Sequence, residues 1–196
     1  YFWDDIKNIL HSLIKFKNDE NFHFAIMIMV SMIPAGFVGF LLEEKINKLF
    51  IGNLLLVGSM LIITSILLII SDKIKSQNRK LNARNSFLIG IAQALAILPG
   101  VSRSGSTIAT SIFAGINRDV AAKFSFLMVI PIIVGSSLKM VLFDNITYDS
   151  SVLLNYIMGF LSALISGYYA CKWMIFFVRK SKLKYFAIYC FIVGIL

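Results

Sequence analysis

The sequence predicts an all-α integral membrane protein, a polytopic bundle of helices that cross the bilayer. Of its 196 residues, 58% are hydrophobic and 15% are charged, whereas an average soluble domain has about 45–50% apolar and about 25% charged residues. Residues 24–42 and 51–70 carry no charged side chain, and about 20 apolar residues suffice for a helix to span the hydrocarbon core. The basic residues concentrate between such runs, so we interpret the net charge of +9 as a topology signal and not as nucleic-acid binding.

The apolar runs divide one membrane domain, residues 1–196, into a series of elements. Within residues 2–14, apolar side chains recur at three- and four-residue spacing, which predicts an amphipathic helix along the membrane interface. Spans are predicted at residues 24–42, 51–70, 122–143 and 152–178, and the start of a further span at residues 185–196. Because that last run is shorter than a span and the first residue is not Met, we expect the chain to be truncated at both ends.

Two shorter apolar segments lie within residues 86–115, and the loop charges decide how they cross the bilayer. The loop 72–86 has five basic residues and one acidic residue, and residues 179–184 include four basic residues and no acidic one. Both therefore belong in the cytoplasm. Counting spans backwards from the second segment, with the acidic loop 144–149 outside, places residue 118 inside. Both ends of the region then lie on one side, which predicts a re-entrant hairpin.

The tip of this hairpin has the composition of an anion-binding site. Pro99 ends the first half-helix, because the residue before a proline is pushed out of the α region. Gly100 and Gly105 allow the backbone to approach a ligand closely. Ser102 or Ser104 can act as the N-cap of the second half-helix, whose free N–H groups and dipole favour an anion. The tip therefore predicts a phosphate-binding turn.

Arg103 is the candidate catalytic residue at this tip. An arginine at the centre of a membrane helix costs about 2.5–3.5 kcal/mol on insertion scales, so it needs a partner. No acidic residue lies within the hairpin, so a carboxylate elsewhere or an anionic ligand must pair with Arg103. Gln93 is the strongly polar side chain of the first half-helix, and either a helix–helix hydrogen bond or a ligand contact would explain it.

The string QALAILPGVSRSGST, residues 93–107, resembles the second signature of the undecaprenyl-diphosphate phosphatase family, the bacitracin-resistance membrane proteins with a PGxSRSxxT motif. The residues in register with that motif are Pro99, Gly100, Ser102, Arg103, Ser104 and Thr107. Further similarity covers residues 31–39 and 124–135. The resemblance implies an inverted-repeat fold in the bacterial inner membrane and hydrolysis of undecaprenyl diphosphate to undecaprenyl phosphate. This reaction recycles the lipid carrier of peptidoglycan synthesis and confers bacitracin resistance.

The resemblance also implies roles for individual residues. Arg103 would clamp the diphosphate, and the hydroxyls of Ser102, Ser104 and Thr107 would donate to its oxygens. The remaining expected substrate-binding residues are Gly100, Gly105 and Gln93. The implied partners are the polyprenyl diphosphate and membrane lipids, while assembly as a homo-oligomer is left open.

The family's first signature, an E-x-x-x-E segment followed by a polar cluster with a histidine, would precede Tyr1. The resemblance implies that a divalent cation, Mg²⁺ or Ca²⁺, takes its ligands from that signature. We therefore expect no metal ligands within these 196 residues and no enzymatic activity from them alone. The alternative function is a transporter or flippase of an anionic lipid or phosphate-bearing substrate, because such proteins also direct half-helix N-termini at an anion in the membrane. An upstream acid pair would favour hydrolysis.

Overall fold

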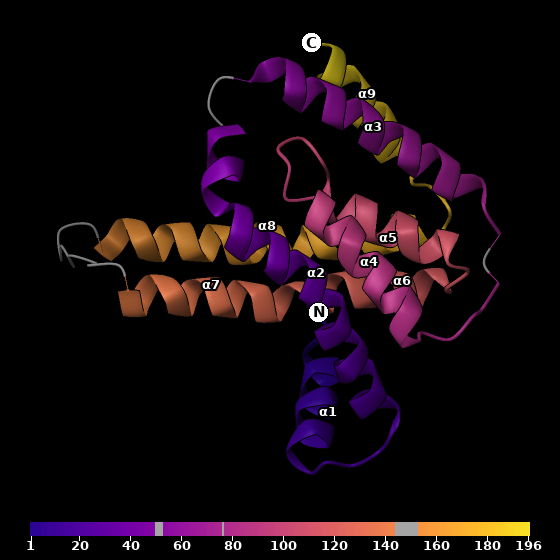
Figure 1. The fold of residues 1–196 in the computed structure, drawn as a ribbon, viewed down its shortest axis with the longest axis vertical. Coiled ribbons are helices and arrows are strands. Elements are labelled where there is room, and N and C mark those ends of the chain that lie inside the picture. Colours follow the sequence, from indigo (N-terminus) through magenta and orange to yellow (C-terminus); the bar gives the residue numbers. More distant parts are fainter. Residues whose placement is uncertain (50–52, 76, 144–152) are drawn as a thin grey trace.

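The computed structural model describes residues 1–49, 53–75, 77–143 and 153–196, apart from the side chains of residues 42–49 and 143. The acidic loop 144–149 lies outside the described residues. The helices are α1 (Trp3–Ile14), α2 (Glu20–Leu49), α3 (Leu54–Lys73), α4 (Ala83–Leu95), α5 (Arg103–Phe113), α6 (Arg118–Leu127), α7 (Val129–Phe143), α8 (Leu153–Arg179) and α9 (Lys184–Ile195). Helices thus account for most of the described chain (Figure 1), and the all-α prediction is confirmed.

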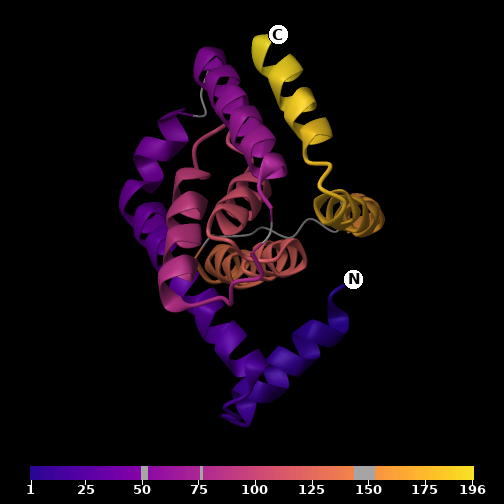
Figure 2. The same ribbon diagram turned by 90° about the vertical axis from the view of Figure 1, so that its right-hand side faces the viewer.

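Four helical stretches within the described residues are long and apolar enough to cross a membrane. They are Glu20–Leu41, Leu54–Lys73, Arg118–Leu142 and Leu153–Arg179. The shorter α9 runs beside α3 (Figures 1 and 2), where Gly58 and Gly194 bring the two backbones together. A Cβ on Gly58 would lie 2.7 Å from the Gly194 carbonyl oxygen. The protein is therefore a multi-pass membrane protein whose helices approach one another through small residues.

The stretch expected as one span at 122–143 begins earlier and is divided. It starts at Arg118, where the Asn117 side chain accepts a hydrogen bond from the Asp119 N–H at 2.8 Å. Met128 then separates α6 from α7. Pro131 explains this break, because it has no N–H to donate to the Leu127 carbonyl four residues earlier. The proline visible in the sequence thus marks a change of helix within the membrane.

The α4–α5 hairpin lies at the centre of the molecule, between α2 and α3 (Figures 1 and 2). α4 begins where the Asn82 side chain accepts a hydrogen bond from the Asn85 N–H at 2.9 Å. It ends at Leu95, earlier than the proline rule predicts. The following N–H groups bond to nearer carbonyls: that of Ile97 donates to Ala94 at 3.2 Å and that of Leu98 to Leu95 at 3.2 Å. The chain therefore tightens into turns before it reaches Pro99.

The three connections predicted to be cytoplasmic meet at one face of the protein. The Arg79 N–H donates to the Gly115 carbonyl at 3.0 Å, which joins the entry of the hairpin to its exit. The buried Arg118 guanidinium donates to three carbonyls at the end of α3, those of Ser71, Asp72 and Ile74. The Asp72 carboxylate accepts from the Leu183 N–H at 3.0 Å, at the start of α9. This arrangement agrees with the topology derived from the loop charges.

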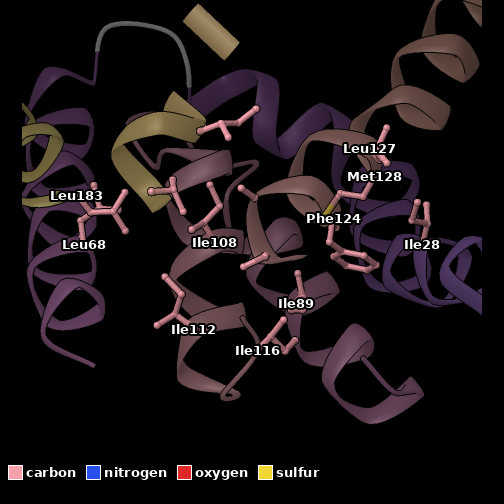
Figure 3. Packing of buried hydrophobic residues seen from close by; sticks show 14 of the residues in the cluster. Ile28, Leu68, Ile89, Ile108, Ile112, Ile116, Phe124, Leu127, Met128 and Leu183 are labelled. Carbon is pink, nitrogen blue, oxygen red and sulfur yellow. The ribbon is translucent and has the colours of Figure 1, made fainter. Parts of the chain in front are cut away.

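A compact apolar core surrounds the hairpin, and Figure 3 shows its side chains meeting from several helices. Ile89 of α4, Ile112 of α5 and Phe124 of α6 are completely buried. α2 packs closely against α4 because Gly90 has no side chain: a Cβ there would lie 2.2 Å from the Ser31 carbonyl oxygen. The hairpin is therefore fixed rigidly between its neighbours.

The amphipathic helix α1 is held against α2 and α6. Its Asp5 forms an ion pair with Lys123 of α6, and Ile9 is buried. In the connection to α2, the Asp19 side chain accepts hydrogen bonds from the Phe22 N–H and the Ser12 hydroxyl, both at 2.9 Å. The Phe22 hydrogen bond contributes most to a lowered pKa of the Asp19 carboxyl. These contacts attach α1 to α2 and α6.

Candidate anion-binding site at the hairpin tip

The turn between α4 and α5 depends on a glycine that lies against α3. Gly100 has a φ of 90°, in the left-handed region that favours glycine. A Cβ at this position would lie 2.4 Å from the carbonyl oxygen of Val57 in α3. The need for glycine is therefore explained by protein packing. The expectation that Gly100 also lets the backbone approach a ligand stays a prediction.

Ser102 is the N-cap of α5, which decides between the two serines left open by the sequence. Its hydroxyl accepts a hydrogen bond from the Gly105 N–H at 3.2 Å, and its carbonyl accepts from the Ser106 N–H at 2.8 Å. A Cβ on Gly105 would lie 2.9 Å from the Ser102 hydroxyl oxygen. The absence of a side chain on Gly105 therefore makes the capping geometry attainable. Like Gly100, Gly105 serves the packing of the turn.

The first turn of α5 leaves two backbone donors free. Among the described residues, no acceptor bonds to the N–H groups of Arg103 and Ser104, as is usual for the first turn of a helix. Both residues are half-buried. Two adjacent N–H groups at the positive end of a helix dipole form a site for an oxyanion.

Arg103 brings a guanidinium group to the same end of α5. Its Nη1 atom is buried and has no hydrogen-bond partner among the described residues. None of the ion pairs in the described part of the chain includes Arg103. The sequence left two possible partners for Arg103, a carboxylate or an anionic ligand, and no described carboxylate pairs with it. The geometry therefore favours an anionic ligand, which the planar guanidinium can bind through two parallel N–H donors.

Thr107 is placed differently from the other hydroxyl residues. It is completely buried, and its Oγ1 lies 2.6 Å from the Ser125 hydroxyl of α6 and 2.9 Å from the Arg103 carbonyl oxygen. These contacts fasten α5 to α6. Ser104, in contrast, has a hydroxyl with no bond to any described residue. The Ser104 hydroxyl is therefore free to contact a ligand, and the Ser102 hydroxyl, which only accepts from the Gly105 N–H, keeps its own O–H to donate. Ser102, Ser104 and Thr107 as phosphate donors stay predictions.

Gln93 and Ser106 are buried polar side chains on the two arms of the hairpin. Gln93 is 2% exposed and Ser106 is 4% exposed. Neither the Gln93 amide nor the Ser106 hydroxyl has a partner among the described residues. An unsatisfied buried polar group costs about 1–3 kcal/mol. Of the two explanations offered for Gln93, the helix–helix hydrogen bond is not formed, which favours a polar species reaching into the hairpin.

The described residues contain no ready cluster of ligands for the divalent cation that the sequence resemblance implies. Across residues 1–49, 53–75, 77–143 and 153–196, no group of three or more His, Cys, Asp or Glu side chains could hold a metal ion. Cys171 and Cys190 are free thiols. What the described residues supply at this tip is a set of hydrogen-bond donors for an anion.

Two structural contacts were not identified from the sequence. The hydroxyl of Thr64, in α3, accepts a hydrogen bond from the Ser102 N–H at 3.2 Å, and Thr64 is completely buried. The only signal was the polar pair Thr64–Ser65 within the apolar run 51–70. The contacts of Arg118 were also missed. Its partners are backbone carbonyl groups, which every residue has, so no sequence pattern marks them.

The chain matches over residues 1–196 the family described as bacitracin resistance protein BacA. An undecaprenyl-diphosphatase of Christiangramia forsetii is 47% identical over 194 residues, which cover 99% of this chain and 74% of the relative. One of Bacteroides fragilis is 46% identical over 198 residues, covering 98% and 74%. One of Halothermothrix orenii is 40% identical over 200 residues, covering 100% and 74%. The resemblance carried by residues 93–107 is thus confirmed, and this chain belongs to the bacitracin resistance protein BacA family.

Proposed function

We propose that this protein is an undecaprenyl-diphosphatase, which hydrolyses undecaprenyl diphosphate to undecaprenyl phosphate, and that its diphosphate binds at the N-terminus of α5. The observation that carries this proposal is the buried Arg103 Nη1 atom, which has no partner in the described part of the chain. A buried cation without a counter-charge is costly, and a diphosphate supplies the missing charge. The names of the relatives, all undecaprenyl-diphosphatases, support the same reaction.

In this proposal, each residue at the tip has a defined task. The Arg103 guanidinium holds two oxygens of the diphosphate, and the N–H groups of Arg103 and Ser104 with the Ser104 hydroxyl bind the remaining oxygens. Negative charge on the transferred phosphoryl group is then stabilised by donors that are already in place. Ser102 and Thr107 build the turn that holds these donors. A divalent cation, Mg²⁺ or Ca²⁺, would add to the charge stabilisation when held by ligands outside the described residues.

The depth of the site suits a lipid substrate. α5 has 11 residues between the tip and the basic face, which at 1.5 Å per residue is about 16 Å, roughly half of the hydrocarbon thickness. A diphosphate at this depth keeps its prenyl chain within the bilayer, against the apolar surfaces of the surrounding helices. We infer that the bacterial inner membrane houses the enzyme, since its carrier lipid serves peptidoglycan synthesis there.

The test is phosphate release from undecaprenyl diphosphate by the full-length protein in detergent with added Mg²⁺. We expect the wild-type protein to release one phosphate per substrate and Arg103→Ala to release almost none. Arg84→Ala is the matched control, because Arg84 is an exposed arginine in the same hairpin. Movement of intact diphosphate across proteoliposomes without phosphate release would contradict hydrolysis and would support the transport alternative.

A further inference from the structure

We propose that Thr64 of α3 is a positioning residue for the anion-binding turn. This inference rests on the proposed function, because it concerns the same site. The role proposed for Thr64 is indirect. Thr64 holds the backbone of Ser102, the residue from which the first turn of α5 starts, by accepting the Ser102 N–H at 3.2 Å.

This hydrogen bond removes one donor from the anion site and fixes the others. The Ser102 N–H is engaged with Thr64, and the Gly105 N–H is engaged with the Ser102 hydroxyl. The free donors in between are those of Arg103 and Ser104. Thr64 therefore influences both the position of the two free N–H groups and the number of donors that face the ligand.

The contact belongs to a continuous face of α3 that supports the turn. Val57 lies against Gly100, Thr64 bonds to Ser102, and Leu68 lies 3.5 Å from where a Cβ on Gly105 would be. Their spacing of seven and four residues places these side chains on one side of the helix. Of these three residues, Thr64 is the one with a polar side chain, so it can orient the turn through a hydrogen bond. Val57 and Leu68 set how closely the turn approaches α3.

Ser65 provides a matched control in the same helix turn. It is as completely buried as Thr64, but its hydroxyl has no partner among the described residues. Adjacent helix residues point about 100° apart. Ser65 also lies seven residues after Gly58, on the side of α3 that meets α9. Ser65→Ala therefore removes a buried hydroxyl without touching the turn.

The experiment measures kcat, KM and thermal unfolding of the full-length enzyme with undecaprenyl diphosphate. Thr64→Val keeps the shape of the side chain and leaves the buried Ser102 N–H without an acceptor. We expect its KM to rise about tenfold, the order expected for losing one buried hydrogen bond. Thr64→Ser restores the acceptor, so its KM should return to within about twofold of wild type. Ser65→Ala should keep the wild-type KM.

The KM separates positioning from a purely structural role, because a smaller folded fraction lowers the apparent kcat and leaves KM unchanged. A double-mutant cycle with Ser104→Ala adds a second readout: the Thr64→Val effect should be non-additive with it, and the Ser65→Ala effect should be additive. A wild-type KM for Thr64→Val, or no recovery by Thr64→Ser, would overturn the inference while wild-type turnover persists. Absence of turnover in the wild type would instead overturn the proposed function.

Discussion

The α4–α5 hairpin and the helices α7 and α8 both depart from the pattern of a water-soluble protein, in which apolar side chains are buried and polar ones exposed. The hairpin is rich in polar residues and is buried, with Gln93, Ser106 and Ser111 all at most 4% exposed. α7 and α8 are apolar and largely exposed, as shown by Ile133 at 55% and Leu164 at 58%. Figure 1 shows the pair running beyond the core, and Figure 2 shows the two helices end-on and apart from each other.

This contrast shows how the bilayer distributes residues. Lipid tails solvate Leu and Ile as well as a protein interior does, so apolar side chains on α7 and α8 gain little from burial. Polar groups find no partner in lipid and are therefore gathered inside the protein. The hairpin consequently concentrates buried polar groups, while α7 and α8 present mostly apolar side chains on their exposed surfaces.

Cysteine labelling gives an all-or-none test of the comparison. We expect Lys80→Cys and Asp119→Cys, which flank the hairpin, to react with a membrane-impermeant maleimide from the cytoplasmic side. Lys182→Cys, after α8, should react from the same side. Tyr148→Cys, in the loop outside the described residues, should react from the opposite side, because α8 crosses the bilayer and the hairpin returns. If position 119 reacts together with position 148, the hairpin is a broken span.

The conservative change Arg103→Lys should reduce kcat/KM by about 100-fold, because an ammonium group cannot supply the two parallel donors of a guanidinium. Thermal unfolding should be unchanged, since Arg103 pairs with no described side chain. The control is Arg84→Lys at the exposed start of α4, which should turn over normally. Near-normal turnover of Arg103→Lys would mean that charge without bidentate geometry is sufficient.

Truncating a large side chain should lower the free energy of unfolding more in the hairpin than in α8. Ile112→Ala leaves a cavity in the core around the hairpin and should lower the free energy of unfolding by about 2–5 kcal/mol. Leu164→Ala exchanges one exposed apolar side chain for a smaller one, with an expected change below about 0.5 kcal/mol. Thermal unfolding in one detergent measures both. Equal losses would show that α8 is covered as tightly as the hairpin.

Glycine substitution sharpens the same contrast with a smaller change. Gly90→Ala places a Cβ 2.2 Å from the Ser31 carbonyl oxygen, so α2 and α4 must separate, at a cost of about 1–3 kcal/mol. Gly159→Ala in α8 meets no described atom within 4 Å and should stabilise the helix by up to about 1 kcal/mol. The readout is the shift of the unfolding temperature. A shift of the same sign in both variants would contradict the packing difference.

The linear pattern was enough to predict much of the hairpin. The loop charges placed both of its ends at one face, and the Arg79–Gly115 hydrogen bond agrees with that placement. Arg103 in an apolar region without an acid indicated an anion site, since an intramembrane charge needs a partner. The end of α4 at Leu95 and the break at Met128 were not predicted, because local carbonyl partners decide where a helix stops.

The amino-acid sequence by itself was enough to predict the all-α membrane fold, the family and a set of candidate site residues, because composition, run length, charge and motif act without knowledge of neighbours. The tertiary structure decided which of those residues are free. In it, the Ser102 N–H donates to Thr64 and the Thr107 hydroxyl bonds to Ser125, whereas the Arg103 Nη1 atom and the Ser104 hydroxyl have no described partner. The physical reason is that hydrogen-bond partners lie on different helices. Only the packing of α3, α5 and α6 brings these groups within about 3 Å, the range of a hydrogen bond.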